Sequence, residues 1–258
     1  MSVLAIANQK GGIGKTTTAV NLAAALSLGC ERVLLVDFDP QANATLHLGV
    51  QPAKLAASVN EAVLGRRSFR AIIQPITEKL HLAPSHPSLT KGAQAIAAMP
   101  DPHTQLGYRL ADIKDEYSYV IIDCPPSMYS LSENALAAAD YVIVPVNADY
   151  LSLEGLGRFC ADIELMKKEG KTQVSLLGIL ITMVDYRKGI TKQSIELLRK
   201  HFGPLVFHTE IKINVKLEEA PSFGKHIFEY APESVGAACY LELAKEVRAR
   251  CQRSLARA

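Results

Sequence analysis

Residues 2–17 of the chain read SVLAIANQKGGIGKTT, and this stretch indicates the type of fold. The apolar run Ser2–Ala7 predicts a buried β-strand, and a glycine-rich turn at residues 10–14 follows it directly. Beyond the turn, apolar residues recur at helical spacing, at Ala19, Leu22, Ala23 and Leu26. Arg32–Asp37 then repeats the strand pattern. The first forty residues therefore predict a strand, a loop, a helix and a second buried strand.

The same alternation continues along the chain. Strands are expected at residues 119–123, 141–146 and 174–182, and helices at 132–139, 151–169 and 191–201, with a last helix at 234–253. Alternation on this scale predicts an α/β fold, doubly wound, with a mostly parallel sheet and helices on both faces. Residues 51–101 are less regular and predict short helices with one strand near 80–83. No Pro-, Gly- or Ser-rich linker divides the chain, so we expect one domain over residues 1–258.

Composition excludes several classes of protein. With 48% hydrophobic and 21% charged residues, the 258-residue chain is too apolar to be disordered. The longest apolar run, residues 176–184, is far shorter than the roughly 20 residues of a membrane-spanning helix. The N-terminus lacks the basic region of a signal peptide, so a cytoplasmic protein is expected. Its net charge of +2 means that any nucleic acid must bind to a local basic patch.

The cysteines do not form a recognisable site. They are odd in number, scattered and without a C-x-x-C pair: Cys30, Cys124, Cys160, Cys239 and Cys251. This pattern argues against a disulfide framework, a zinc site and a dithiol redox motif. We expect reduced thiols that lie mostly in the core.

The turn between the first strand and its helix has the form of a phosphate-binding loop. Glycines let successive backbone N–H groups point inward around an anion, and the start of the helix adds partial positive charge. Lys15 would reach the β- and γ-phosphates of a nucleotide, and the Thr16 hydroxyl would bind Mg²⁺. The expected nucleotide-binding residues are Lys10, Gly11, Gly12, Ile13, Gly14, Lys15, Thr16 and Thr17. ATP and Mg²⁺ are therefore the expected cofactors.

One departure from the general P-loop formula is informative. Gln9 stands where the formula has its first glycine, and Lys10 precedes the glycine pair. The string KGGIGKT resembles the deviant Walker A loop of the ParA/MinD family of ATPases. The resemblance implies that Lys10 crosses a dimer interface to the nucleotide of the partner.

Acidic residues stand at the ends of two expected strands. Asp37 and Asp39 point to one side of a strand end, where carboxylates alone would more often cap a loop. The string DFDPQAN at 37–43 resembles the family's second nucleotide motif, which implies that Asp39 positions the attacking water and that Asp37 lies near Mg²⁺. Asp123 ends an apolar strand in Walker B form and is expected to hold Mg²⁺. The expected metal residues are thus Thr16, Asp37 and Asp123, and the catalytic residues Lys10, Lys15 and Asp39.

Later strings resemble the partition branch of the family, ParA/Soj. They are DCPPS (123–127), NALAAAD (134–140), LEGL (153–156), TMVDYR (182–187), EAPSFGK (219–225) and PESVGAACYLELAKE (232–246). The resemblance implies a slow ATP hydrolase that forms an ATP-sandwich dimer, binds DNA without sequence preference and becomes nucleoid-associated. It would partition chromosome or plasmid DNA when a ParB-like adaptor stimulates hydrolysis.

Two other functions are compatible with a deviant Walker A loop. A MinD-like or ParA-like ATPase could position a protein assembly or act at a membrane, but the basic terminal helix offers too little apolar area for a membrane anchor. A metabolic relative, such as the nitrogenase iron protein class, would carry a cluster cysteine where this chain has Ser130. Membrane binding and the metabolic class are both disfavoured.

A basic window supplies the expected DNA contacts. Between residues 187 and 216 there are seven Lys or Arg residues and two Glu. The candidate DNA-binding residues are Arg187, Lys188, Lys212 and Lys216, and the alternative is an ordinary solvated helix face. The partition branch usually has an arginine where this chain has Ile213, so the DNA contacts there differ from the family pattern.

Overall fold

The computed structural model describes all residues except 30, 127–129, 149–152 and 256–258. The strands are β1 (Ser2–Ile6), β2 (Val33–Asp37), β3 (Gln74–Pro75), β4 (Leu80–Ala83), β5 (Tyr119–Asp123), β6 (Tyr141–Asn147), β7 (Ser175–Val184) and β8 (Val206–Lys212). The helices are α1 (Lys15–Ser27), α2 (Asn43–His47), α3 (Val59–Val63), α4 (Leu89–Ala97), α5 (Gln105–Ala111), α6 (Ser130–Ala138), α7 (Leu153–Lys168), α8 (Gly189–Phe202), α9 (Val215–Glu219), α10 (Ile227–Tyr230) and α11 (Val235–Leu255).

In the part of the chain described, the strands form one sheet in the order β3-β4-β2-β5-β1-β6-β7-β8. Every neighbouring pair is parallel except β3 and β4. Pro75, which cannot donate to a ladder, lies in the antiparallel edge strand β3, where a missing N–H is tolerated. The chain moves from β1 to one side of the sheet through β2 and β4, and later to the other side through β6. This reversal leaves a crevice at the carboxyl end of β1.

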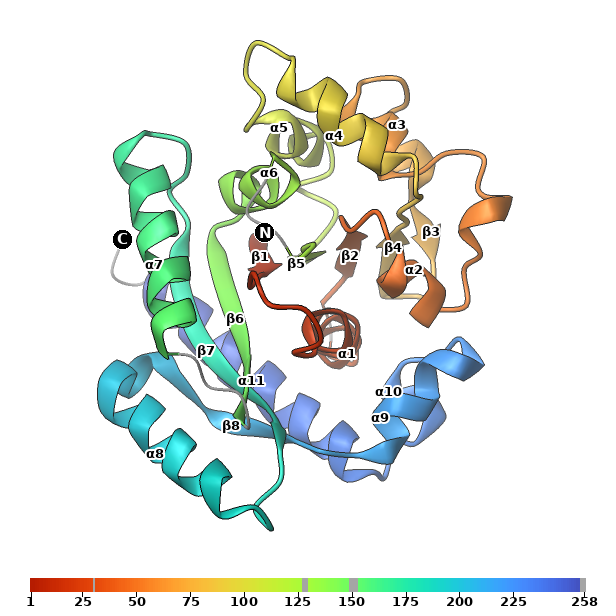
Figure 1. Ribbon diagram of the computed structural model, residues 1–258. Coiled ribbons are helices and arrows are strands. Elements are labelled where there is room, and N and C mark those ends of the chain that lie inside the picture. The colour runs from red at the N-terminus through yellow and green to blue at the C-terminus, as the bar shows by residue number, and fades with distance from the viewer. Residues whose placement is uncertain (30, 127–129, 149–152, 256–258) are drawn as a thin grey trace.

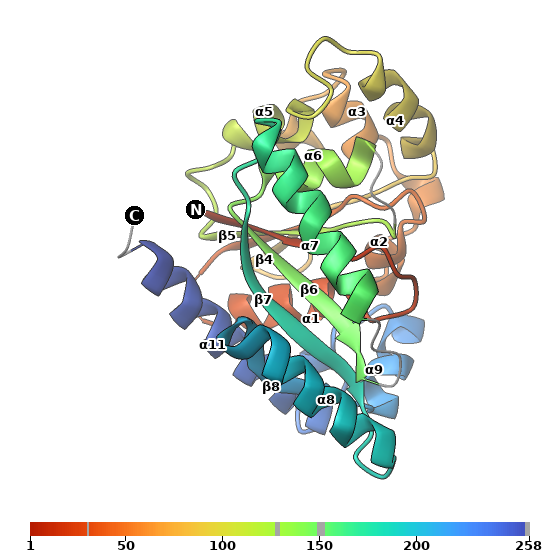
Figure 2. The ribbon, with the colours of Figure 1, turned by 60° about the vertical axis from the view of Figure 1, so that its left-hand side comes forward.

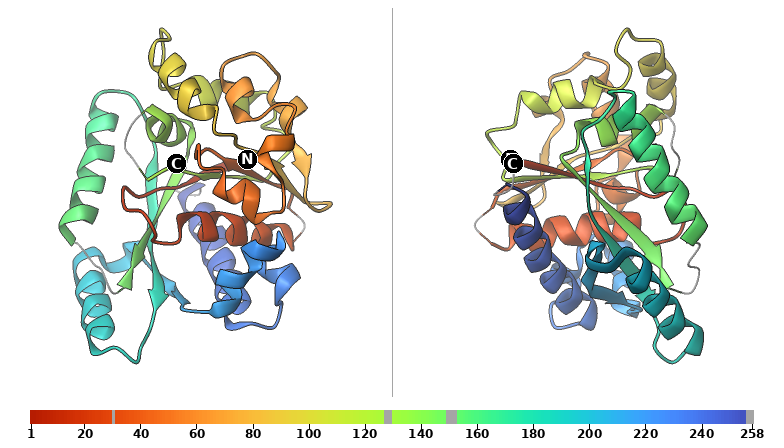
Figure 3. Two further views of the ribbon diagram at one scale, coloured as in Figure 1. Left: turned by 45° about the vertical axis from the view of Figure 1, so that its right-hand side comes forward. Right: turned by 90° about the vertical axis from the view of Figure 1, so that its left-hand side faces the viewer.

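Both faces of the sheet are buried because side chains alternate along each strand. Val3 and Ala5 pack on the face covered by α3–α8, and Leu4 and Ile6 pack on the face covered by α1, α2 and α9–α11. Figures 1 and 3 show the two helical layers on either side of the sheet, and Figure 2 shows α7 and α8 beside β6, β7 and β8. The expected doubly wound α/β fold is confirmed.

The expected strands at 119–123 and 80–83 match β5 and β4 residue for residue. The sequence did not reveal either edge strand. Residues 51–101 contain a second strand, β3, which is only two residues long and so leaves no alternating pattern. The residues of β8, VFHTEIK, are polar in the middle, and the pairing of β8 with β7 shifts register twice. Edge strands of this kind lack the unbroken apolar run that marks a central strand.

The terminal helix α11 packs into the core along its apolar side. Ala244, Val247 and Cys251 are buried at 0–2% exposure in the layer that contains α1. Arg248 forms an ion pair with Glu31. The apolar side that a membrane anchor would need is therefore already covered. Among the described helices, none is long and apolar enough to cross a membrane.

The four described cysteines are free thiols, and Cys30 lies outside the described residues. Cys124 and Cys251 are buried, whereas Cys160 and Cys239 are partly exposed. Burial raises the pKa of the Cys124 thiol, with Asp123 adding to the shift. These described thiols form no disulfide with one another.

Candidate active site

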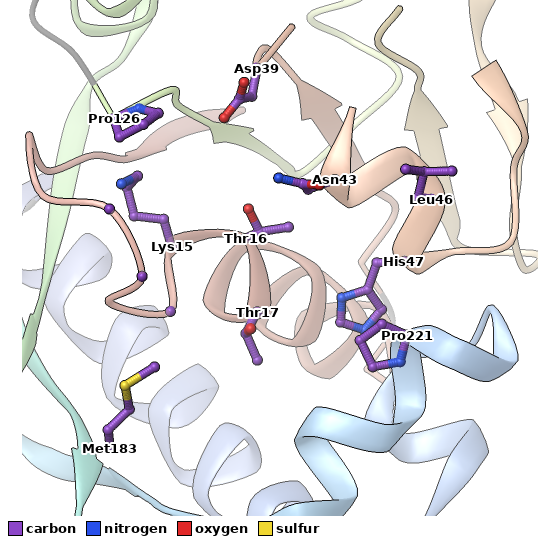
Figure 4. A pocket seen from close by; sticks show the side chains of 13 residues that line it. Lys15, Thr16, Thr17, Asp39, Asn43, Leu46, His47, Pro126, Met183 and Pro221 are labelled. Atoms are coloured by element: carbon purple, nitrogen blue, oxygen red, sulfur yellow. The ribbon is translucent and has the colours of Figure 1, made fainter. Parts of the chain in front are cut away.

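A cavity of about 480 Å³ opens at the carboxyl end of β1, at the crevice expected from the strand order. Figure 4 shows the side chains that surround it. Its lining consists of Gly11, Gly12, Gly14, Lys15, Thr16, Thr17, Asp39, Asn43, Leu46, His47, Pro126, Met183 and Pro221. Four other parts of the chain, at residues 39–47, 126, 183 and 221, therefore meet the glycine-rich loop and the start of α1 around this cavity.

The loop after β1 needs glycine at two positions. Gly12 and Gly14 have φ angles of 70° and 81°, in the left-handed region that other residues rarely adopt. Gly14 is also the N-cap residue immediately before α1, so the loop leads directly into the helix N-terminus. Ile13 anchors the loop, because its side chain is buried and its carbonyl accepts a hydrogen bond from the Thr182 hydroxyl at 3.0 Å. The loop is thus shaped for an anion by β7 as well as by its own sequence.

Lys15 is the buried cation of the cavity, at 7% exposure. Its Nζ donates to the main-chain carbonyl of Lys10 at 2.7 Å. Burial lowers the pKa of the ammonium, and the nearby carboxyl of Asp123 offsets part of this effect. Lys10 itself is exposed at the rim of the loop. The two lysines therefore differ in environment, since Lys15 is buried in the cavity and Lys10 is exposed, and the role of Lys10 across a dimer interface stays a prediction.

Asp37 and Asp123 end adjacent strands and pair directly in the register of β2 and β5. Both Asp37 oxygens accept hydrogen bonds: Oδ2 accepts from the N–H and the hydroxyl of Thr45, each at 2.7 Å, and Oδ1 accepts from the Asp39 N–H at 3.2 Å. Burial raises the pKa of Asp37 to about 6 despite these bonds. Asp37 is therefore held in place by protein groups, and its role near a metal stays a prediction.

Asp123, unlike Asp37, is not held by hydrogen bonds of good geometry. Its carboxyl is fully buried, and neither oxygen has a hydrogen-bond partner of good geometry. Burial raises its pKa well above the usual range, Asp37 raises it further, and the nearby Thr16 hydroxyl lowers it only in part. A buried carboxylate without partners is costly unless a cation completes it. Thr16 and Asp123 are thus suited to a divalent cation, although no cluster of three or more His, Cys, Asp or Glu is found among the described residues.

Asp39 is 7% exposed. Its side chain faces the cavity, as Figure 4 shows. Its Oδ1 accepts a hydrogen bond from the Gln41 N–H at 2.9 Å. The side chain therefore caps the turn after β2 and also lines the cavity, so both roles considered from the sequence are compatible with its position.

One wall of the cavity is formed by residues that the sequence does not mark as functional. Asn43, Leu46 and His47 come from α2, whereas Met183 and Pro221 come from β7 and from the 3₁₀ turn Ala220–Phe223. His47 is 4% exposed, and burial together with His226 lowers its pKa to about 4. A neutral imidazole on this wall could contact a sugar or base but not a phosphate as a cation. In the sequence, the stretch 219–225 points to this wall only through its resemblance to the partition branch, which assigns it no role.

The candidate DNA residues lie outside the cavity. Arg187 pairs with Asp185, with Nη2 and Oδ2 2.7 Å apart, and Lys216 pairs with Glu219, with Nζ and Oε2 2.8 Å apart. Lys188 precedes α8, and Lys212 is exposed at the end of β8. Asp185 and Glu219 stand just outside the basic window counted in the sequence. The local positive charge is consequently smaller than that count indicates.

Comparison with known proteins identifies the relatives. The family model for an AAA domain matches residues 1–176. The chain is 46% identical over 249 residues to the chromosome-partitioning ATPase Soj of Thermus thermophilus, covering 96% of each chain. It is 43% identical over 248 residues to the sporulation initiation inhibitor protein Soj of Bacillus subtilis, covering 96% of this chain and 98% of the relative.

Solved structures agree with the fold and with the expected cofactors. Cobyrinic acid a,c-diamide synthase from Mycobacterium smegmatis with bound ADP and magnesium has a TM-score of 0.84 and 33% identity, covering 95% of this chain and 93% of the other. The ATP complex of a McdA variant from Cyanothece has a TM-score of 0.85 and 25% identity, covering 96% of each chain. Since the curated relatives match nearly end to end at more than 40% identity, this chain belongs to the ParA/Soj family of chromosome-partitioning ATPases.

Proposed function

We propose that the protein binds Mg-ATP in the cavity after β1 and hydrolyses it to ADP and phosphate. The observation that carries this proposal is the buried, unpartnered carboxylate of Asp123 beside Thr16 and Lys15. Mg²⁺ would be held by Thr16 and Asp123 and would neutralise phosphate charge. ADP with magnesium in the structure of the Mycobacterium smegmatis relative supports the same pair of cofactors.

The chain's own groups then have separate tasks. The backbone N–H groups of residues 10–17 and the ammonium of Lys15 bind the phosphates. Asp39 orients the attacking water from the opposite wall of the cavity, and this positioning is the main protein contribution to hydrolysis in such sites. The family resemblance implies a low intrinsic turnover that a partner protein would stimulate.

The proposed partition cycle is supported by the resemblance to the ParA/Soj family. ATP binding would bring two copies together, with the exposed Lys10 of each copy reaching the nucleotide of the other. The ATP-bound dimer would bind DNA without sequence preference through Arg187, Lys188, Lys212 and Lys216, so that a cytoplasmic protein becomes associated with the nucleoid. A ParB-like adaptor would stimulate hydrolysis and reset the dimer.

Three measurements on the full chain test this function. Phosphate release is measured with Mg-ATP, with and without EDTA, for the wild type and for Lys15→Ala. DNA co-sedimentation and anionic-liposome co-sedimentation are measured with ATP and with ADP. We expect Mg²⁺-dependent hydrolysis, and DNA pelleting in ATP only. Hydrolysis that persists in Lys15→Ala would exclude this cavity, and pelleting with liposomes in place of DNA would favour a membrane-positioning ATPase.

A further inference from the structure

Two buried hydroxyl side chains lie behind the loop that carries Asp39. Thr45 is on α2, eight residues after Asp37, and Ser85 follows β4. Both residues are at 0% exposure, and neither lines the cavity. Ser85 comes from the segment 51–101, which carries no recognised motif.

Their hydrogen bonds form a closed ring with the aspartates. The Thr45 hydroxyl donates to Asp37 Oδ2 at 2.7 Å and accepts the Ser85 N–H at 2.9 Å. The Ser85 hydroxyl donates to the main-chain carbonyl of Asp39 at 2.7 Å. The Asp39 N–H closes the ring by donating to Asp37 Oδ1 at 3.2 Å. Each hydroxyl therefore has a specific partner, and the ring joins the ends of β2 and β4 to α2.

The loop held by this ring is not in a relaxed conformation. Ala42 has a φ of 53° although it is not glycine, and its N–H donates to the same Asp39 carbonyl at 2.9 Å. Non-glycine residues keep this conformation only where the surrounding contacts enforce it. The Asp39 carbonyl thus accepts two hydrogen bonds, one from inside the strained turn and one from Ser85. The second bond fixes the turn against β4.

We propose that Thr45 and Ser85 are positioning residues for ATP hydrolysis. They hold the main chain of Asp39 and the carboxyl of Asp37, so that the Asp39 carboxylate stays at the cavity wall without either hydroxyl touching the nucleotide. This inference rests on the proposed function, in which Asp39 orients the attacking water. It also gives the segment 51–101 a task, because that segment supplies Ser85.

The test compares hydroxyl deletions inside and outside the ring. Thr45→Val removes the hydroxyl but keeps the shape and the backbone N–H, and Ser85→Ala removes the other hydroxyl. Thr172→Val is the matched control. Thr172 is 3% exposed, donates to the Leu136 carbonyl at 2.6 Å and accepts the Val174 N–H at 3.0 Å, but it lies just before the amino end of β7. Steady-state kinetics with Mg-ATP and thermal unfolding are measured for the full-length variants.

We expect Thr45→Val and Ser85→Ala to lower kcat about tenfold, the loss that corresponds to one buried hydrogen bond, with KM for ATP nearly unchanged. All three variants should lower Tm by a similar amount, because each loses one buried hydroxyl. Thr172→Val, however, should keep the kcat of the wild type. Thr45→Ser, which restores the hydroxyl, should recover most of the turnover. If Thr45→Val does not fold, the comparison of Ser85→Ala with Thr172→Val and the Thr45→Ser result carry the test.

Three results would overturn the inference. They are normal kcat in the ring variants, a rise in KM in place of a fall in kcat, and a loss in Thr45→Ser equal to that in Thr45→Val. A wild-type chain that does not hydrolyse ATP would instead contradict the proposed function. The two failures are therefore distinguishable.

Discussion

The ammonium of Lys15 donates a hydrogen bond to the main-chain carbonyl of Lys10, with 2.7 Å between Nζ and the oxygen. The glycine loop thus folds over its own lysine and satisfies a cation that burial disfavours. Phosphate oxygens would offer this ammonium a stronger, charged acceptor than a carbonyl. The contact therefore places the lysine at the centre of the loop while keeping it available for a nucleotide.

Replacement of Lys15 by alanine should lower the affinity for both ATP and ADP by at least about a hundredfold, because the main charge-assisted contact to the β- and γ-phosphates is lost. Isothermal titration calorimetry measures the effect directly. Circular dichroism controls for folding. Unchanged affinity in a folded variant would show that the P-loop assignment is wrong.

Lys10→Ala should behave differently, since Lys10 is exposed and its carbonyl, which Lys15 contacts, is retained by alanine. We expect ADP affinity close to that of the wild type, but weaker dimerisation with a slowly hydrolysed ATP analogue and slower turnover. Analytical ultracentrifugation gives the dimer fraction. A variant that dimerises and hydrolyses ATP normally would remove Lys10 from the site.

Asp39→Ala should retain ATP binding and lose turnover, because the carboxylate faces the cavity from the wall opposite the P-loop and is not one of the phosphate-binding groups. The loss of the hydrogen bond from the Gln41 N–H should also cost about 1 kcal/mol of folding stability. Since ATP is not consumed, gel filtration after incubation with Mg-ATP should show a persistent dimer, and DNA binding should last longer than in the wild type. A monomer peak from a folded variant would leave Asp39 with its capping role alone.

Charge reversal at Lys212 and Lys216 should make the dependence of DNA affinity on salt less steep, since each phosphate contact contributes a slope of about −0.9 in log K against log salt. The control is reversal at Lys171 and Lys245, which changes the net charge equally. Lys245 pairs with Glu242 three residues away, as Lys216 pairs with Glu219. Fluorescence anisotropy across a salt series measures both slopes. Equal slopes in the two double variants would place the DNA face elsewhere.

His47 should make the fold sensitive to acid. Burial lowers its folded-state pKa from 6.5 to about 4, so the unfolded chain binds a proton between these values and the folded chain does not. This contribution to stability is present above about pH 6.5 and is lost as the pH falls towards 4, by about 3 kcal/mol in total. Asp37, whose pKa is raised to about 6, acts in the opposite direction.

A variant separates these two effects. When the pH is lowered from about 7 to about 4.5, the Tm of His47→Gln should fall less than the Tm of the wild type, because the glutamine does not titrate. Differential scanning calorimetry without nucleotide makes the comparison, and His201→Gln, at an exposed position on α8, is the control. Parallel Tm curves for the wild type and His47→Gln would show that His47 does not titrate in this way.

Local pattern was enough to predict the P-loop, the central strands and the strand-end aspartates. The signals involved are local: they are glycines with positive φ, apolar runs and helical spacing. The structures of KGGIGKTT and of the strand before Asp123 can therefore be predicted without knowing where the rest of the chain lies. The same holds for the order of strands and helices, which predicted the doubly wound sheet. The single-domain organisation stays a prediction.

The cavity wall and the support of the aspartates depend on contacts between distant segments. His47 and Pro221 lie on the same cavity although they are far apart in the sequence, and Ser85 reaches Asp39 through the neighbouring strand β4. Asp123 has no hydrogen-bond partner of good geometry, whereas Asp37 accepts three hydrogen bonds from two residues, Thr45 and Asp39. Two similar strand ends do not reveal this difference. Burial and partners of a polar group follow from packing in three dimensions, and packing sets the energy of that group far more than its neighbours in the chain do.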